Sequence, residues 1–61
     1  MTLEDRFKSA VRRAYGAAGV RLQDHHADSL ASIYANWAKG ADDGVVARVE
    51  RALAASLGVR A

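Results

Sequence analysis

The stretch TLEDRFKSAVRRAYGAAG, Thr2 to Gly19, predicts an amphipathic α-helix and with it the class of fold. Its apolar residues recur at spacings of three and four, which places them on one face of a helix: Leu3, Phe7, Ala10, Val11, Ala14, Tyr15 and Ala18. Thr2 is suited to cap the N-terminus, and Glu4 and Asp5 place negative charge where the helix dipole favours it. We expect the helix to end at Gly16 or Gly19, with Gly19 as the terminating residue.

Two further segments repeat this pattern. In the second, from Asp24 to Gly40, Asp24 is the expected N-cap and Gly40 the expected stop. The residues predicted to face the core are His26, Leu30, Ile33, Tyr34, Trp37 and Ala38, and those predicted to point away are Asp28, Ser32, Ala35 and Lys39.

The third segment is expected to begin at Asp42 or Asp43 and to end at Gly58. Its predicted inner side carries Val45, Val46, Val49, Ala52, Leu53, Ser56 and Leu57. Its predicted outer side carries Ala47, Arg48, Arg51, Ala54 and Ala55.

Short connections between three amphipathic helices force neighbours to run antiparallel, so we predict an all-α fold, a compact antiparallel three-helix bundle forming a single domain over residues 1–61. The side chains expected at its centre are Leu3, Phe7, Leu30, Ile33, Trp37, Val49 and Leu53. A chain this short buries only about 60% of the surface that its unfolded form exposes, so the core will be thin. Any part of the stripe around Ile33 and Trp37 that the core cannot cover would form an adhesive patch.

Composition argues against several classes of protein. The chain has no cysteine, which excludes disulfides and thiolate ligands for metals. Its first residues lack the order of a signal peptide, and no apolar run has the length of a membrane span, so we expect a soluble cytoplasmic protein with no membrane contact. The abundance of arginine and alanine would suit a bacterial or phage genome rich in GC.

The pair His25 and His26 predicts no metal site, because successive residues on a helix diverge by about 100° and cannot bind one ion together. The triplet Asp28-Ser29-Leu30 resembles the attachment motif of acyl and peptidyl carrier proteins, which would imply a phosphopantetheine on Ser29. Those carriers are acidic and longer, whereas this chain is basic, and helix capping alone explains a serine at this place. With no nucleophile elbow and no phosphate-binding glycine loop, we expect no enzyme, no cofactor and no metal.

The hypothesis favoured by the sequence is a small protein-binding module with no catalytic activity, docking onto a larger protein or onto a second copy of itself. Alanines on the outer side of the third segment permit close approach of another helix, and arginines flank them. The predicted partner-binding residues are Arg12, Arg13, Ala47, Arg48, Arg51, Ala54 and Ala55.

The alternative is a small DNA-binding regulator. The sequences WAKG, residues 37–40, and ALAASLGV, residues 52–59, are similar to the end of a lambda-repressor-type helix-turn-helix domain, a resemblance that implies nucleic acid as the partner. The stretch from Gly19 to Trp37 has the length of one helix where that family needs two. The net charge of +2 is also mild for a protein that neutralises phosphates, so nucleic acid is the second candidate.

Overall fold

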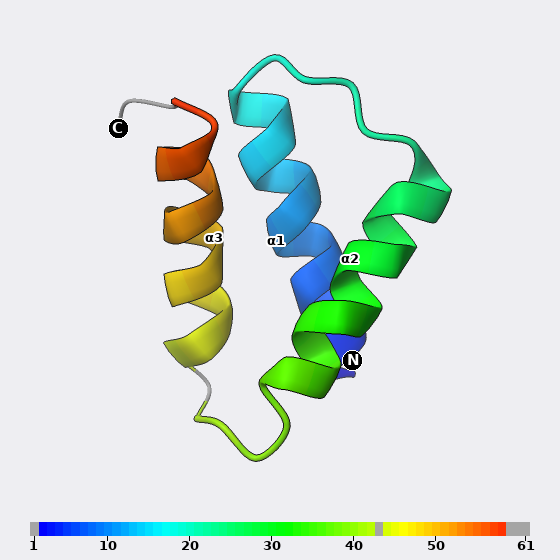
Figure 1. Ribbon diagram of the computed structural model, residues 1–61, viewed down its shortest axis with the longest axis vertical. Coiled ribbons are helices and arrows are strands. Elements are labelled where there is room, and N and C mark those ends of the chain that lie inside the picture. The colour runs from blue at the N-terminus through cyan, green and yellow to red at the C-terminus, as the bar shows by residue number, and fades with distance from the viewer. Residues whose placement is uncertain (1, 43, 59–61) are drawn as a thin grey trace.

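The computed structural model describes residues 2–42 and 44–58, and in this part of the chain it contains three helices: α1 (Leu3–Ala17), α2 (Asp24–Trp37) and α3 (Gly44–Ser56). The chain runs up α1, down α2 and up α3, so that consecutive helices are antiparallel (Figure 1). The predicted all-α three-helix bundle is confirmed. Asp43, one of the two expected starts of the third helix, and Val59, the last residue of ALAASLGV, lie outside the described residues.

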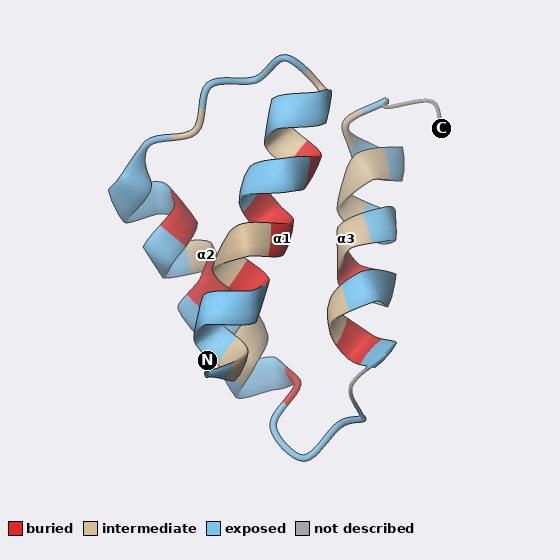
Figure 2. Ribbon diagram, turned by 180° about the vertical axis from the view of Figure 1, so that it is seen from behind, coloured by how far each residue is buried: buried red, intermediate tan, exposed pale blue. Residues whose placement is uncertain are grey.

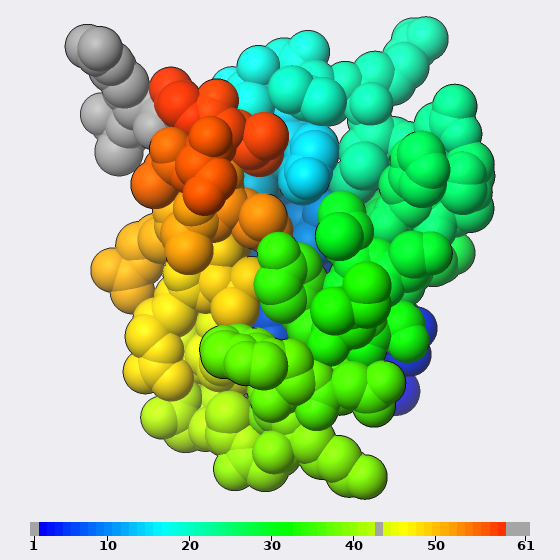
Figure 3. Space-filling model, viewed as in Figure 1, coloured from blue at the N-terminus to red at the C-terminus, as the bar shows by residue number. Residues whose placement is uncertain are grey.

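α1 is the central helix of the bundle. It packs against both other helices, whereas no Cα atom of α2 lies within 8 Å of a Cα atom of α3 in the described part of the chain. Seen from behind, α1 stands between its two neighbours (Figure 2). In the opposite, space-filling view green atoms of α2 lie against yellow atoms of α3, and blue atoms of α1 are visible in the gaps between them (Figure 3). Side chains nevertheless bridge the two outer helices, because Ala31 and Ala38 belong to one buried cluster with Phe7, Val45 and Val49.

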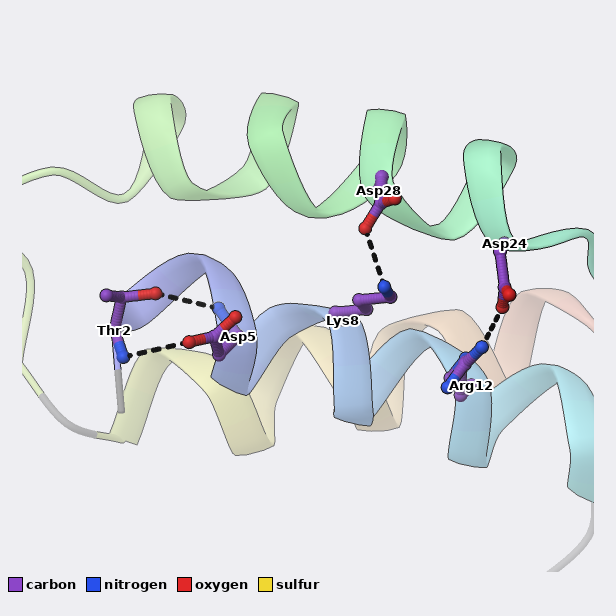
Figure 4. Close-up of polar contacts among 6 residues, drawn as sticks. All are labelled: Thr2, Asp5, Lys8, Arg12, Asp24 and Asp28. Atoms are coloured by element: carbon purple, nitrogen blue, oxygen red, sulfur yellow. Dashed lines mark hydrogen bonds and ion pairs between the residues drawn. The ribbon is translucent and has the colours of Figure 1, made fainter.

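The predicted ends of α1 are confirmed. The Thr2 hydroxyl accepts a hydrogen bond from the backbone N–H of Asp5 at 3.2 Å, and the Asp5 carboxylate accepts one from the N–H of Thr2 at 3.3 Å. This reciprocal capping box satisfies two N–H groups that a helix start otherwise leaves free (Figure 4). After Ala17, Gly19 adopts a left-handed conformation with φ of 74°, which turns the chain away from the helix.

The start of α2 differs from the prediction. Its N-cap is Gln23, which makes no capping hydrogen bond through its side chain, and Asp24 is the first helical residue. The Asp24 carboxylate instead forms an ion pair with Arg12 of α1. At the far end, Gly40 has φ of 84° two residues beyond Ala38, the residue that caps the C-terminus, in agreement with its predicted role.

The ends of α3 lie close to their predicted places. Asp42 stands before the helix, and its carboxylate accepts a hydrogen bond from the N–H of Gly44 at 2.9 Å. The helix ends at Ser56, and Gly58 follows in the left-handed conformation with φ of 81°.

The core lies between α1 and the facing sides of α2 and α3, and one buried cluster draws on all three helices. The fully buried side chains of greatest volume, Phe7 and Val11, come from α1, and the ring of Tyr34 stacks on Phe7 with centroids 5.7 Å apart. Buried residues, red in Figure 2, lie along α1 and on the sides of the other helices turned toward it. The complete buried set is Phe7, Ala10, Val11, Ala14, Ala27, Ala31, Ala38, Val45 and Val49.

The prediction for the buried face of α2 was right for Ala38, which is buried, and for Tyr34, which packs on Phe7, but it placed the other predicted residues wrongly or only partly right. Ile33 and Trp37, expected at the centre, are 62% and 67% exposed. His26 is also exposed and Leu30 only half-buried, whereas Ala35, expected to point away, is half-buried. The face that packs carries Ala27, Ala31 and Ala38, because these small side chains let the two helices come close together. Trp37 lies about 100° and Ile33 about 140° around the helix from this alanine face.

The prediction for α3 was largely right. Val45 and Val49 are buried, and Val46, Leu53 and Leu57 are half-buried. Ala52 and Ser56, expected on the inner side, are exposed, and Ala54, expected outside, is half-buried.

Candidate protein-binding surfaces

Two ion pairs join α1 to α2 along one edge of their interface. Arg12 is paired with Asp24, and the Nζ of Lys8 lies 2.8 Å from an Oδ1 of Asp28 (Figure 4). The two bases stand four residues apart on α1 and the two acids four residues apart on α2, so each pair is one helical turn from the other. The two acidic residues of α2, Asp24 and Asp28, therefore both form ion pairs within the chain.

Another ion pair joins α1 to α3. The Nη2 of Arg13 lies 2.7 Å from Oε1 of Glu50, and its Nε lies 3.2 Å from each carboxylate oxygen. The hydrogen bonds from Arg13 lower the pKa of Glu50 below its ordinary value, although the partial burial of that carboxylate acts in the opposite direction. The same hydrogen bonds raise the pKa of Arg13, so both groups stay charged over the neutral range.

The predicted partner-binding arginines differ in their availability. Arg48 lies 3.2 Å from the carboxylate of Asp42, so it, like Arg12 and Arg13, has an acidic partner in its own chain. Arg51 is exposed and forms no ion pair with any residue that the structure describes. The two predicted arginines on α1 contact different neighbours, Arg12 contacting α2 and Arg13 contacting α3, and they do not extend the outer side of α3.

The predicted alanines of the outer side of α3 are mostly where the sequence placed them. Ala47 and Ala55 are exposed, and Arg51 lies between them at four-residue spacing. Ala54 is half-buried and contributes less surface. The accessible part of the predicted surface is therefore the line formed by Ala47, Arg51 and Ala55, with Arg48 beside it.

The predicted partner-binding residues do not include the exposed stripe of α2, although the sequence predicted an adhesive patch around Ile33 and Trp37 wherever the core could not cover them. We define this stripe as the exposed residues His26, Ile33 and Trp37 together with the half-buried Leu30. With Val20, Ile33 and Trp37 are the large apolar side chains that the described chain leaves exposed. The sequence did hold a signal for this surface, because Ala27, Ala31 and Ala38 offer a second apolar face on the same helix. A helix with two apolar faces can bury only one of them against a single neighbour.

The described residues contain no cluster of three histidine or acidic side chains that could hold a metal ion. The rings of His25 and His26 lie tilted with centroids 4.3 Å apart. No buried side-chain nitrogen or oxygen in this part of the chain lacks a hydrogen-bond partner. None of the described helices is both long and apolar enough to cross a membrane.

Comparison with known proteins finds no protein-family model, no curated protein and no solved structure that matches this chain. The functional argument therefore depends on the surfaces just described.

Proposed function

We propose that this chain is a small non-catalytic protein-binding module that docks a helical surface onto a larger protein or onto a second copy of itself. The observation that carries the proposal is the pair Ile33 and Trp37, which lie one turn apart on α2 and are 62% and 67% exposed. A single exposed apolar residue needs no explanation, but adjacent large ones form a patch of the kind that marks interaction sites. Tryptophan in particular is enriched among the residues that dominate the energy of binding.

The distribution of charge favours a protein partner over nucleic acid. Four of the eight lysines and arginines that the structure describes, Lys8, Arg12, Arg13 and Arg48, have a carboxylate partner within the chain, which reduces the positive charge available to neutralise phosphates. The stretch from Asp24 to Trp37 is one uninterrupted helix, α2, which gives the DNA-binding alternative no separate recognition helix.

The outer side of α3 is the second surface of the proposed module. Ala47 and Ala55 permit close approach of another helix, and Arg51 can offer a bidentate contact to an acidic group of the partner. The arginines that already hold carboxylates, Arg12, Arg13 and Arg48, would contribute only by exchanging partners.

Affinity capture of the tagged chain from cells that naturally express it, with and without nuclease, tests this function. We expect a stoichiometric protein companion that survives nuclease and that is lost with Trp37→Ser. Val20→Ser is the matched control, because Val20 is also exposed but lies outside α2. The variant Arg51→Glu, captured in the same way, tests separately whether the outer side of α3 contacts the companion. Recovery dominated by nucleic acid and lost as salt rises would refute the proposal in favour of the DNA-binding alternative.

A further inference from the structure

We propose that the exposed stripe of α2 binds the same stripe of a second copy, in an antiparallel arrangement about a two-fold axis. This inference rests on the proposed protein-binding function and names the partner. Two observations support it: the spacing of the stripe and its lack of charge.

The spacing of the stripe fits antiparallel pairing. The intervals from His26 to Leu30, Leu30 to Ile33 and Ile33 to Trp37 are four, three and four residues. This order of intervals is the same in both directions along the helix. A two-fold axis midway between Leu30 and Ile33 therefore sets each Leu30 opposite the partner's Ile33, and each His26 opposite the partner's Trp37. Intervals of four and three are also those of a coiled-coil seam, whose residues interlock with the residues of a facing helix.

The absence of charge suits a contact between identical surfaces. A two-fold interface brings each patch against its own copy, so charged patches meet with equal sign. The stripe and its exposed neighbours Ser29 and Asn36 carry no formal charge when His26 is neutral. The acids of α2, Asp24 and Asp28, lie at another edge of the helix, where they pair with α1. The outer side of α3 is less suitable, because a two-fold contact there would bring copies of Arg51 together.

The surface of one chain gives the scale of the interface. Its accessible surface is 4297 Å². A specific dimer buries about 800 Å² on each partner, or about a fifth of that surface. The four residues of the stripe supply only part of this area, so we expect a dissociation constant in the micromolar range.

Concentration is the first variable to test. Light scattering during size exclusion should show a mass that rises from 6.5 kDa toward twice that value as the protein is concentrated. Trp37 is the single tryptophan of the chain, and its fluorescence should shift to the blue over the same range as the side chain leaves water. Ile33→Glu should raise the dissociation constant about 30-fold or more, with unchanged helicity because Ile33 is exposed in the single chain. Val20→Glu, at another exposed apolar position, should leave the dimer intact.

Cysteine cross-linking tests the geometry, since the natural chain contains no cysteine. At a rise of about 1.5 Å per residue, the two copies of residue 33 lie about 5 Å apart along the helix axis, and the two copies of residue 26 about 16 Å apart. Ile33→Cys should therefore form a disulfide-linked dimer under mild oxidation, and His26→Cys should not. Equal cross-linking at both positions would indicate parallel helices and overturn the arrangement.

A chain that stays monomeric at every concentration would overturn the dimer. If such a monomer still lost its captured protein companion with Trp37→Ser, the protein-binding function would stand and only its assignment to a second copy would fail.

Discussion

Arg13 of α1 holds the carboxylate of Glu50 of α3 with two guanidinium nitrogens, Nη2 at 2.7 Å and Nε at 3.2 Å. The two residues are 37 positions apart in the chain, so this bidentate contact forms only when α3 has docked against α1. Its energy is modest because the Arg13 side chain is 60% exposed, and solvent screens such pairs.

This pair predicts a loss of stability in acid. The pKa of Glu50 is lower in the folded chain than in the unfolded one, so its contribution is complete above 4.5, the ordinary value, and is lost as the pH falls through the lowered folded-state pKa. Arg13→Gln should lower the free energy of unfolding at pH 7 by about 0.5–1 kcal/mol and return the pKa of Glu50 toward its ordinary value. Urea unfolding and an NMR titration of the Glu50 carboxyl measure both effects. Arg51→Gln is the control, and equal titration of Glu50 in both variants would contradict the prediction.

The capping box predicts that α1 depends on Thr2. Thr2→Ala removes the hydroxyl that accepts from the N–H of Asp5, and should cost about 1 kcal/mol of stability. In a domain of this size that loss lowers the melting temperature by about 4–8 °C. Thr2→Ser keeps the hydroxyl and should melt close to the natural chain. If alanine and serine at this position melted together, the cap would have no energetic role.

Phe7 and Trp37 should respond in opposite ways to truncation. Phe7 is fully buried, so Phe7→Ala should cost about 3–5 kcal/mol and leave little or no folded protein at 25 °C. Trp37 is 67% exposed, so Trp37→Ala in dilute solution should change stability by no more than about 0.5 kcal/mol. Circular dichroism of both variants during urea unfolding gives the comparison. A loss at Trp37 as large as that at Phe7 would mean that Trp37 belongs to the core.

The features of the fold that could be predicted from the sequence are those set by local chemistry. The spacing of apolar residues gave three helices, the hydroxyl of Thr2 gave the start of α1, and the φ of 74° at Gly19 follows from the absence of a side chain. The valines of α3 were placed correctly because that helix has one strongly apolar face.

The orientation of α2 could not be predicted from its own pattern, because it depends on how closely two helices approach. Leu30, Ile33 and Trp37 are the more hydrophobic set, but Ala27 and Ala31 allow the shorter distance to α1. The availability of the candidate arginines could not be predicted from the sequence either. The candidate arginines could be identified by residue type, but their carboxylate partners come from other helices or turns and depend on the packed geometry.

The two glycines near the end of α1 predict opposite effects of the same substitution. Gly16 lies within the helix, and a Cβ added there would meet no atom within 4 Å, so Gly16→Ala should stabilise the chain by about 0.4–1 kcal/mol by restricting its unfolded state. A Cβ at Gly19 also meets nothing within 4 Å, but its φ of 74° strains any residue with a side chain, so Gly19→Ala should cost about 1–2 kcal/mol. Because both sites have open space, the difference between the two variants isolates backbone conformation from packing. Thermal unfolding in parallel should move the melting temperature up for Gly16→Ala and down for Gly19→Ala. Shifts of the same sign would show that the helix does not end where the left-handed turn at Gly19 places it.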